Sequence, residues 1–332
     1  MSETWPDRGQ LLEMAAGFRN ACVLGAAAEL ELFDLLNDRC LSLDEIVVPL
    51  RSDRRATRIL LDALAAIRVL KKADGRYSVP EPLRPLLQSQ TPQTVLPMIQ
   101  HNMAILRGWS GLAWTVKGGL PAPRVSSIRG PGADRAAFIA AMHTVSGPAA
   151  DDVIRRFQPP PFKHLLDVGG ASGTWTLALL RAATADARAT IFDLPDAIQQ
   201  ARARIAQCEL GDRIALAPGD FYRDELPSGV DFAWVSAIIH QHGRAENQAL
   251  FAKVHRALVP GGTIGIRDFV MSADRTQPPQ GALFAVNMLA NTEWGDTFSF
   301  DEIAEDLQAA GFVEPQLRLA AQDMNAIVVA RR

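Results

Sequence analysis

The strand, turn and helix between His164 and Thr174 constrain the fold more than any other part of this chain. The apolar run from His164 to Val168 predicts a short strand, the glycine-rich turn GGASG (169–173) follows it directly, and a helix is predicted from Thr174. Glycines are needed where a ligand approaches the backbone closely, because a Cβ atom would obstruct that approach. The alternative is a tight structural turn that binds nothing.

The segments after this turn alternate between helix and strand. A helix is predicted over Thr174–Ala187, a strand over Ala189–Phe192, and a helix over Pro195–Cys208 that opens with proline in its first turn. Val230–Ile239 is a nearly continuous apolar run, as expected of a parallel strand that is covered on both faces. This alternation predicts an α/β fold built on an open, doubly wound, Rossmann-like sheet.

Two features of this region indicate an adenosine-containing cofactor. Asp193 follows Gly173 by 20 residues, at the end of the next predicted strand, where a carboxylate can accept both hydroxyls of a ribose. The glycines are spaced GGxxG rather than GxGxxG, and no G-K-[ST] sequence follows, so neither the dinucleotide fingerprint nor the phosphate loop is matched. Asp167, just before the glycines, is a candidate to hold a cationic amino group of the cofactor.

The residues before this region follow a different pattern, and a chain of 332 residues is long enough for two domains. Apolar residues recur at helical spacing over residues 10–115, Ser42 and Glu45 form a capping-box pattern, and Asp74-Gly75 predicts a hairpin. Helices followed by a small hairpin predict a winged helix. Three prolines at 159–161 interrupt the chain, so we predict an N-terminal domain over 1–158 and an α/β domain over 159–332.

A winged helix raises the hypothesis of DNA binding, which Arg51, Arg54, Arg55 and Arg58 would serve. The alternative is that these arginines form the solvent-exposed face of one helix and that the domain serves dimerisation. We favour dimerisation and expect no nucleic-acid partner, because the net charge is −3 and the sequence shows no broader basic region.

Composition and cysteine usage narrow the class of protein further. Hydrophobic residues make up 48% and charged residues 21% of the chain, which is typical of a globular protein. Cys22, Cys40 and Cys208 form neither a disulfide pattern nor a C-x-x-C metal spacing, which favours a cytoplasmic location. We expect no membrane partner, because neither a signal peptide nor an apolar window of about 18 residues is found.

Five motifs occur in order along the chain: DVGGASG (167–173), FDLP (192–195), GDF (219–221), a histidine after an apolar strand (His240), and PGG (260–262). Together they resemble the plant caffeic-acid-type O-methyltransferases and the bacterial O-methyltransferases of polyketides and other secondary metabolites. The resemblance covers nearly the whole chain, because the predicted winged helix is similar to that family's dimerisation domain. It implies S-adenosylmethionine (SAM) as cofactor, S-adenosylhomocysteine (SAH) as its product, and a homodimer joined through the N-terminal domains.

The resemblance also implies a set of cofactor contacts. Together with Asp167, these are Gly169, Gly170 and Gly173 at the methionine end, Asp193 and Leu194 at the ribose, Asp220 and Phe221 at the adenine, and Ser236. Ser236 stands at a position that is often lysine in the plant members, which weakens that one contact.

The resemblance implies that His240 is the catalytic base, and its predicted place at the carboxyl end of a strand agrees with this role. A neutral imidazole can take the proton of an acceptor hydroxyl during attack on the methyl group. Asp268, which follows His240 by 28 residues, matches a family position held by glutamate and would orient the base. The family's second acid aligns with Thr297, which leaves Asp296, Glu293 or no residue to replace it.

Two alternatives for His240 remain at this point. It could be a structural histidine at a strand end, or it could bind a metal together with His242. We expect no metal, because a metal site needs three or more ligands and the sequence offers no obvious third one nearby.

The resemblance places acceptor contacts on the helix before the α/β domain and on a helix inserted after its fifth strand. The implied residues are Phe138, Met142 and His143, then Phe284, Asn287, Met288 and Asn291. Methionine and phenylalanine would suit a flat, apolar acceptor, although each of these residues could equally belong to the core. Trp109 is interpreted as packing between domains.

We therefore predict SAM-dependent methyl transfer to a hydroxyl oxygen of a small aromatic or polyketide-like acceptor, with His240 as general base. Two alternatives stay open. One is methylation of nitrogen or carbon, or a SAM reaction without a base, on the same scaffold. The other is a SAM-sensing winged-helix regulator.

Overall fold

The computed structural model describes residues 5–170 and 173–332, without the side chains of 143, 145, 146, 148, 200 and 203. The chain forms two compact units: the first contains residues up to 107 and 124–144, and the second contains 108–123 and 145–332. Helix α9 (Pro131–Phe157) therefore has residues in both units. The domain boundary predicted after residue 158 coincides with the end of this helix, whereas the compact units change at residue 144.

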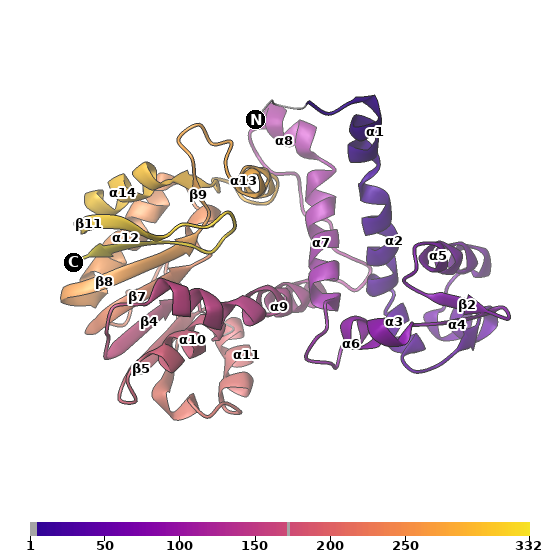
Figure 1. Cartoon of the computed structure of the whole chain (residues 1–332), viewed down its shortest axis with the longest axis horizontal. Coiled ribbons are helices and arrows are strands. Elements are labelled where there is room, and N and C mark those ends of the chain that lie inside the picture. The colour runs from indigo at the N-terminus through magenta and orange to yellow at the C-terminus, as the bar shows by residue number, and fades with distance from the viewer. Residues whose placement is uncertain (1–4, 171–172) are drawn as a thin grey trace. The chain divides into compact units, whose positions relative to one another are not determined.

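The first unit is largely helical. Its elements are α1 (Arg8–Ala16), α2 (Phe18–Glu29), α3 (Leu32–Leu36), β1 (Leu41–Ser42), α4 (Leu43–Leu50), α5 (Arg54–Ala66), β2 (Lys71–Ala73), β3 (Arg76–Ser78), α6 (Arg84–Leu87) and most of α7 (Leu96–Trp109). Helices α2 and α7 lie side by side (Figure 1), and the Gln100 side chain donates a hydrogen bond to the carbonyl of Ala28.

The winged-helix pattern predicted from the sequence is present in this unit. The three short strands form a sheet in the order β1-β3-β2. Asp74 and Gly75 link β2 to β3, and both have positive φ angles, 50° and 70°, as a tight hairpin turn requires. Ser42 and Glu45 form the predicted capping box at the start of α4.

The second unit contains the predicted α/β sheet. Its helices are α8 (Leu112–Gly118), the later part of α9, α10 (Thr174–Ala182), α11 (Pro195–Ile205), α12 (Arg244–Ala257), α13 (Pro279–Asn291) and α14 (Phe300–Ala309). Its strands are β4 (His164–Val168), β5 (Arg188–Asp193), β6 (Ile214–Pro218), β7 (Val230–Ser236), β8 (Leu258–Asp268), β9 (Val270–Met271), β10 (Phe298–Ser299), β11 (Val313–Leu319) and β12 (Ala326–Arg331).

Seven of these strands form one sheet in the order β11-β12-β8-β7-β4-β5-β6. The five strands from β8 to β6 are parallel, and β12 and β11 join antiparallel at one edge. The strand order reverses between β4 and β7, which is the switch point where open α/β sheets bind ligands at the carboxyl ends of their strands.

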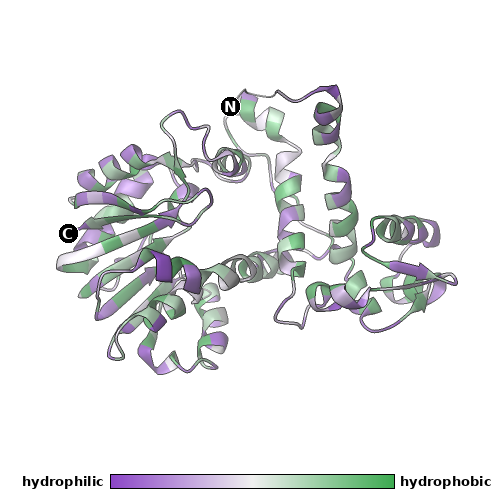
Figure 2. Ribbon diagram, in the orientation of Figure 1, coloured by the Kyte–Doolittle hydropathy of each residue, from purple (hydrophilic) through white to green (hydrophobic). Residues whose placement is uncertain are grey.

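Helices cover both faces of this sheet. Residues of α12 and α14 pack on one face, and residues of α9, α10 and α11 pack on the other (Figure 1). Hydrophobic residues run along the central strands (Figure 2). Such a doubly covered sheet explains why Val230–Val235 is apolar at every position except Asp231.

Three predicted elements end at least three residues earlier than expected. The helix predicted over Thr174–Ala187 ends at Ala182, because Ala183 is extended. The helix predicted to Cys208 ends at Ile205. The strand predicted to Ile239 ends at Ser236, because Ala237 has a left-handed φ of 58°, and a 3-10 turn follows over Ile239–Gln241. His240 therefore lies on this turn rather than at the end of the strand.

Among the residues that the structure describes, no helix is both long enough and apolar enough to cross a membrane.

Candidate functional site

The glycine-rich turn needs glycine for steric reasons. Gly169 has a φ of 72°, its N–H donates to the carbonyl of Phe192 at 2.8 Å, and a Cβ atom there would lie 2.5 Å from the Cδ1 of Ile238. Gly173, with a φ of 67°, is the N-cap of α10. Residues 171 and 172 of the motif lie outside the described residues. A larger residue at position 169 would clash with Ile238, and the positive φ angles of Gly169 and Gly173 are strained for other residues, so the fold itself requires glycine at these positions.

Asp167 lies under this turn with its carboxyl group buried. The hydroxyl of Thr176 donates to it, and a Cβ atom on Gly170 would lie 2.3 Å from its Cγ. Burial, with a smaller contribution from Asp193, raises the pKa of Asp167 to about 7. A buried carboxyl of this kind is stabilised in its charged form when a cation lies next to it.

The residues expected at the ribose and the adenine come from neighbouring strand ends. Asp193 is the last residue of β5 and pairs with Pro218 of β6. Its Oδ1 accepts from the N–H of Leu194 at 2.7 Å, and its carbonyl accepts from Gly219 at 2.9 Å. The loop after β6 begins with Gly219 and carries Asp220 and Phe221, so the sheet brings the predicted contacts to one edge.

This loop is tied to α12 and to the turn that carries His240. The Lys253 ammonium of α12 donates to the carbonyls of Phe221 and Asp224, at 2.7 and 2.8 Å. Tyr222 places its hydroxyl 2.6 Å from Nε2 of His242, and Phe221 packs against the rings of Tyr222 and His242. Neither Tyr222 nor Lys253 is among the site residues predicted from the sequence.

The tautomer of His242 follows from its hydrogen bonds. Asn247 donates its side-chain N–H to the carbonyl of Ile239 at 3.0 Å, so its Oδ1 faces Nδ1 of His242 at 3.1 Å. Nδ1 is therefore the donor, and Nε2 accepts from the Tyr222 hydroxyl. Burial lowers the pKa of His242, which keeps this ring neutral. Both ring nitrogens of His242 are thus engaged, and this side chain links the loop to the turn.

His240 and Asp268 form a buried pair. Nδ1 of His240 lies 2.9 and 2.8 Å from Oδ1 and Oδ2 of Asp268, and the side chains are 7% and 2% exposed. The backbone N–H of Phe269 also donates to Asp268. Because the carboxylate accepts from Nδ1–H, Nε2 carries the lone pair, and it has no hydrogen-bond partner in the part of the chain that the structure describes.

None of the candidates for a second acid bonds to the imidazole ring. Asp296 pairs with Arg275 at 3.1 Å and its backbone N–H donates to the carbonyl of His240. Glu293 is exposed, and Thr297 is buried with its hydroxyl directed to the carbonyl of Gly281. Asp268 is therefore the one carboxylate bonded to this ring among residues 5–170 and 173–332.

Four of the predicted acceptor residues lie on α13, in the second unit. The ring of Phe284 meets the ring of His240 edge-on, with centroids 4.8 Å apart. Oδ1 of Asn287 accepts a hydrogen bond from Nε1 of Trp109 at 3.0 Å. The side-chain amide of Asn291 donates to the carbonyl and to Oδ1 of Asn287. Met288 is buried. Trp109 belongs to the same unit as Asn287 and positions it, a role that the sequence analysis missed.

The other three predicted acceptor residues lie on α9, in the first unit. Phe138 is 43% exposed and its ring packs against His101, with centroids 5.1 Å apart. Met142 is half-buried. The side chain of His143 lies outside the described residues. Their assignment to the acceptor therefore stays a prediction.

Part of the basic stretch in the winged helix is neutralised by ion pairs. Arg54 pairs with Asp44 at 2.8 Å, and Arg58 pairs with Asp62 at 3.1 Å. Asp62 also accepts from Lys72. These pairs reduce the positive charge that this helix presents.

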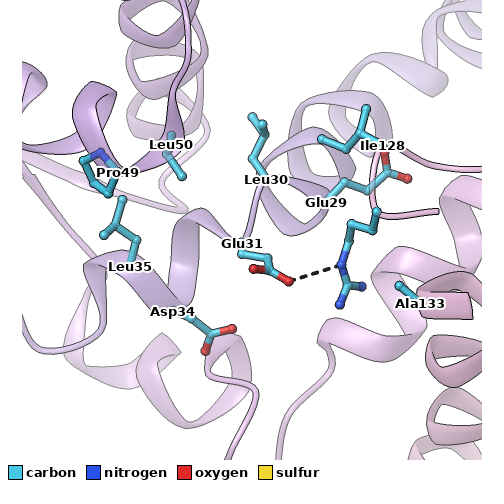
Figure 3. Close-up of a pocket in the computed structure, with 10 residues that line it drawn as sticks. Glu29, Leu30, Glu31, Asp34, Leu35, Pro49, Leu50, Ile128 and Ala133 are labelled. Carbon is cyan, nitrogen blue, oxygen red and sulfur yellow. Dashed lines mark ion pairs between the residues drawn. The ribbon is translucent and has the colours of Figure 1, made fainter.

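A cavity of about 600 Å³ lies within the first unit, and none of the predicted site residues lines it (Figure 3). Its charged lining residues are engaged: Glu29 pairs with Arg107, Glu31 pairs with Arg129 at 3.3 Å, and Asp34 accepts from the backbone of Ser89. Nothing about this cavity indicates a ligand.

Two family models match the chain. The model described as an O-methyltransferase domain matches residues 122–313, which is more than half of the chain. The model described as an O-methyltransferase dimerisation domain matches residues 12–82.

Curated relatives align along nearly the whole chain. The tetracenomycin polyketide synthesis 8-O-methyl transferase TcmO of Streptomyces glaucescens is 29% identical, over 92% of this chain and 91% of its own length. The 3-hydroxy-5-methyl-1-naphthoate 3-O-methyltransferase of Streptomyces sahachiroi is 29% identical, over 96% and 93%. Acetylserotonin O-methyltransferase of Gallus gallus is 29% identical, over 96% of each chain.

Solved structures share the fold. LaPhzM superposes with a TM-score of 0.85 at 26% identity, over 98% of this chain and 99% of its own. PigF, solved with SAH, superposes with a TM-score of 0.84 at 24% identity, over 98% and 100%.

Proposed function

This chain belongs to the O-methyltransferase family, and from that premise we propose that it transfers the methyl group of SAM to a hydroxyl of a small aromatic acceptor with His240 as general base. The observation that supports this best is the buried pair of His240 and Asp268, which leaves Nε2 of the imidazole with its lone pair. A general base must be neutral and must have one ring nitrogen available to the acceptor.

SAM supplies an electrophilic methyl group on its sulfonium sulfur. His240 takes the acceptor's proton at Nε2 as the hydroxyl oxygen bonds to the methyl carbon and the carbon–sulfur bond breaks, so that the methyl ether, SAH and an imidazolium are formed. Asp268 holds Nδ1–H, so it fixes the tautomer beforehand and stabilises the positive charge afterwards. The turn Ile239–Gln241 is held by the bonds from Asn247 and Asp296 to its carbonyls, which keeps the base in position.

The residues at the carboxyl edge of the sheet fit the parts of SAM. Gly169, Gly170 and Gly173 lie between β4 and α10 at this edge, and their backbone without side chains would lie against the methionine end. Asp193 has a carboxylate at the end of β5 for the ribose, and Phe221 offers a ring to the adenine. We keep Asp167 as the partner of the cofactor's ammonium group, because a buried carboxyl with a raised pKa gains most from a nearby cation.

An aromatic acceptor is supported by what surrounds His240. The ring of Phe284 lies against the imidazole, and Phe269 packs behind Phe284 at 5.2 Å. Aromatic rings favour aromatic partners by edge and offset contacts. The relatives named for a naphthoate and for acetylserotonin act on ring-bearing molecules, and we extend that class to this chain.

We also propose that the enzyme is a cytoplasmic homodimer joined through the N-terminal domains. The matched dimerisation domain supports this state, and Leu11, Leu12, Met14 and Phe18 are all more than half exposed on α1 and α2. All three cysteines carry free thiols, which suits a reducing compartment. Analytical ultracentrifugation that finds only monomer at micromolar concentration would contradict the dimer.

The first experiment is a calorimetric titration of the purified protein with SAM, beside Asp193→Ala and with NADH as a comparison ligand. Saturable binding of SAM that Asp193→Ala loses, with no binding of NADH, supports the cofactor site. A folded protein that binds no SAM contradicts the proposal.

The second experiment tests the base. N-acetylserotonin, a hydroxynaphthoate and a polycyclic phenol serve as probe acceptors with labelled SAM. His240→Ala should lower kcat by about 10²-fold or more while leaving SAM affinity unchanged. Turnover that survives in His240→Ala would favour the alternatives, namely N- or C-methylation or a base-independent reaction.

A further inference from the structure

Arg267 is a buried cation without an anionic partner in the protein. It is the penultimate residue of β8 and is 5% exposed. Its Nε donates to Oδ1 of Asn325 at 2.9 Å, and its Nη1 donates to the hydroxyl of Ser236 at 3.1 Å. Its guanidinium carbon lies 4.2 Å from the centre of the Trp175 ring. All three partners are neutral.

No carboxylate within the described residues lies at ion-pair distance from Arg267. Asp268 and Asp323 interact with it only at longer range, and burial lowers its pKa to about 10, so it stays protonated at neutral pH. Asn325 is itself held by Asp323, which fixes the direction of its Oδ1. A buried charge that is not paired with an opposite charge is costly, and the contact with the Trp175 ring offsets only part of that cost.

The guanidinium retains donors for a ligand. It has five N–H groups, of which two are used by Asn325 and Ser236, so three remain. Two adjacent nitrogens of an arginine match the two oxygens of a carboxylate.

The sheet register places Arg267 on the same face as the carboxyl group of Asp167. Asp167 pairs with Trp234, and Ser236 pairs with Arg267. Paired residues share a face, and residues two apart along β7 also share it. Asp167 and Arg267 therefore stand in successive rows of one face, near the carboxyl ends of the strands, and they make no ion pair with each other.

We propose that Arg267 binds the α-carboxylate of the methionine part of SAM and SAH, as the counterpart of Asp167 at the α-ammonium. The proposal rests on the proposed use of SAM. The two unpaired groups then match the two charges of one zwitterion. Arg267 pairs with Ser236 in the sheet register and donates to its hydroxyl, so the positive charge at the carboxyl end of β7 comes from the neighbouring strand β8.

The test compares SAH with its decarboxylated analogue, S-adenosyl-3-thiopropylamine, by calorimetric titration of the full-length protein. The wild type should bind SAH at least about tenfold more tightly than the analogue, because a hydrogen bond to a charged group contributes about 1.5–3 kcal/mol. Arg267→Gln should remove this preference by weakening SAH alone, and Arg267→Lys should restore part of it. Arg181→Gln, which removes an exposed arginine of α10, should leave both affinities unchanged.

Each other outcome overturns the inference. A wild type that binds both ligands equally well contradicts it even if the variants fail to fold. An Arg267→Gln protein that weakens both ligands equally shows a structural role instead. A folded wild type that binds neither ligand removes the proposed cofactor as well, whereas a wild type that binds SAH without preference leaves the proposed function intact.

Discussion

At the end of β8, two buried charged side chains lie on opposite faces of the sheet and have different partners. On one face Asp268 accepts hydrogen bonds from His240 and from the backbone of Phe269. On the other face its neighbour Arg267 has only the neutral partners Ser236 and Asn325 and the Trp175 ring. The charge of Asp268 interacts with another side chain of the protein, and it can therefore tune the catalytic base. The charge of Arg267 has only neutral partners in the protein and is paired by the proposed ligand, so substitution of Arg267 should change the affinity for that ligand.

Removing the carboxylate on the first face should have the largest effect. Asp268→Asn can present an amide N–H to His240 and favour the wrong tautomer, so kcat should fall by about 10²–10⁴-fold. Calorimetry should find SAH affinity unchanged, in contrast to Arg267→Gln. If Asp268→Asn lowers the affinity for SAH by as large a factor as it lowers kcat, catalysis and cofactor binding are not separated between the two faces of the sheet.

The buried carboxyl on the second face should make stability depend on pH. The pKa of Asp167 is about 7 in the folded protein and ordinary in the unfolded chain, so its contribution to stability is full below about pH 4 and is lost as the pH rises to about 7. Asp167→Asn has no ionisable group at this position, so its stability should not decrease for this reason as the pH rises. Without cofactor, its Tm should exceed that of the wild type by several degrees at pH 8, at about 2–4 °C per kcal/mol.

Thermal unfolding at pH 5, 6, 7 and 8 checks this prediction, and the difference in Tm should grow with pH. Calorimetry should show that the same variant binds SAH more weakly. A difference in Tm that is constant across this range would mean that the Asp167 carboxyl is compensated within the protein, unlike Arg267.

The smallest effect is expected at the link between the cofactor loop and the catalytic turn. Tyr222→Phe removes the hydroxyl that His242 accepts at 2.6 Å, so SAH affinity should fall by about two- to tenfold, as for the loss of one neutral hydrogen bond. The decarboxylated analogue should weaken by the same factor, because this link acts at the adenine end. A selective loss of SAH alone would contradict this division, and equal SAH binding to Tyr222→Phe and wild type would show that the link is structural.

The parts of the site that could be predicted are those that local rules govern. The order of strands and helices follows from the glycine turn and from continuous apolar runs, and the capping box and the hairpin follow from four residues or fewer. The family resemblance implied that His240 pairs with Asp268, and the two side chains meet because the parallel strands β7 and β8 end at the same edge of the sheet. The exact end of β7 could not, because the left-handed Ala237 has no signal in its residue type.

The partners of single side chains were beyond prediction. Arg267 carries a sequence signal, a charge at the end of a buried apolar strand, but its unpaired state depends on what the neighbouring strands and Asn325 present to it. The link from Tyr222 through His242 to Asn247 joins three separate elements. Asp296 lies near His240 in the fold, yet its carboxylate pairs with Arg275.

The sequence by itself predicted the α/β sheet and the winged helix, because turn geometry and hydrophobic periodicity are local properties of the chain. Its ordered motifs indicated the family, and the resemblance implied the proposed pair of His240 and Asp268. The tertiary structure alone decided which buried charges are neutralised and which are not. That outcome depends on register between strands distant in sequence, since a side chain's electrostatic partner is set by the face on which it lies. Asp268 and Arg267 are consecutive residues, and the sheet separates them into two different environments.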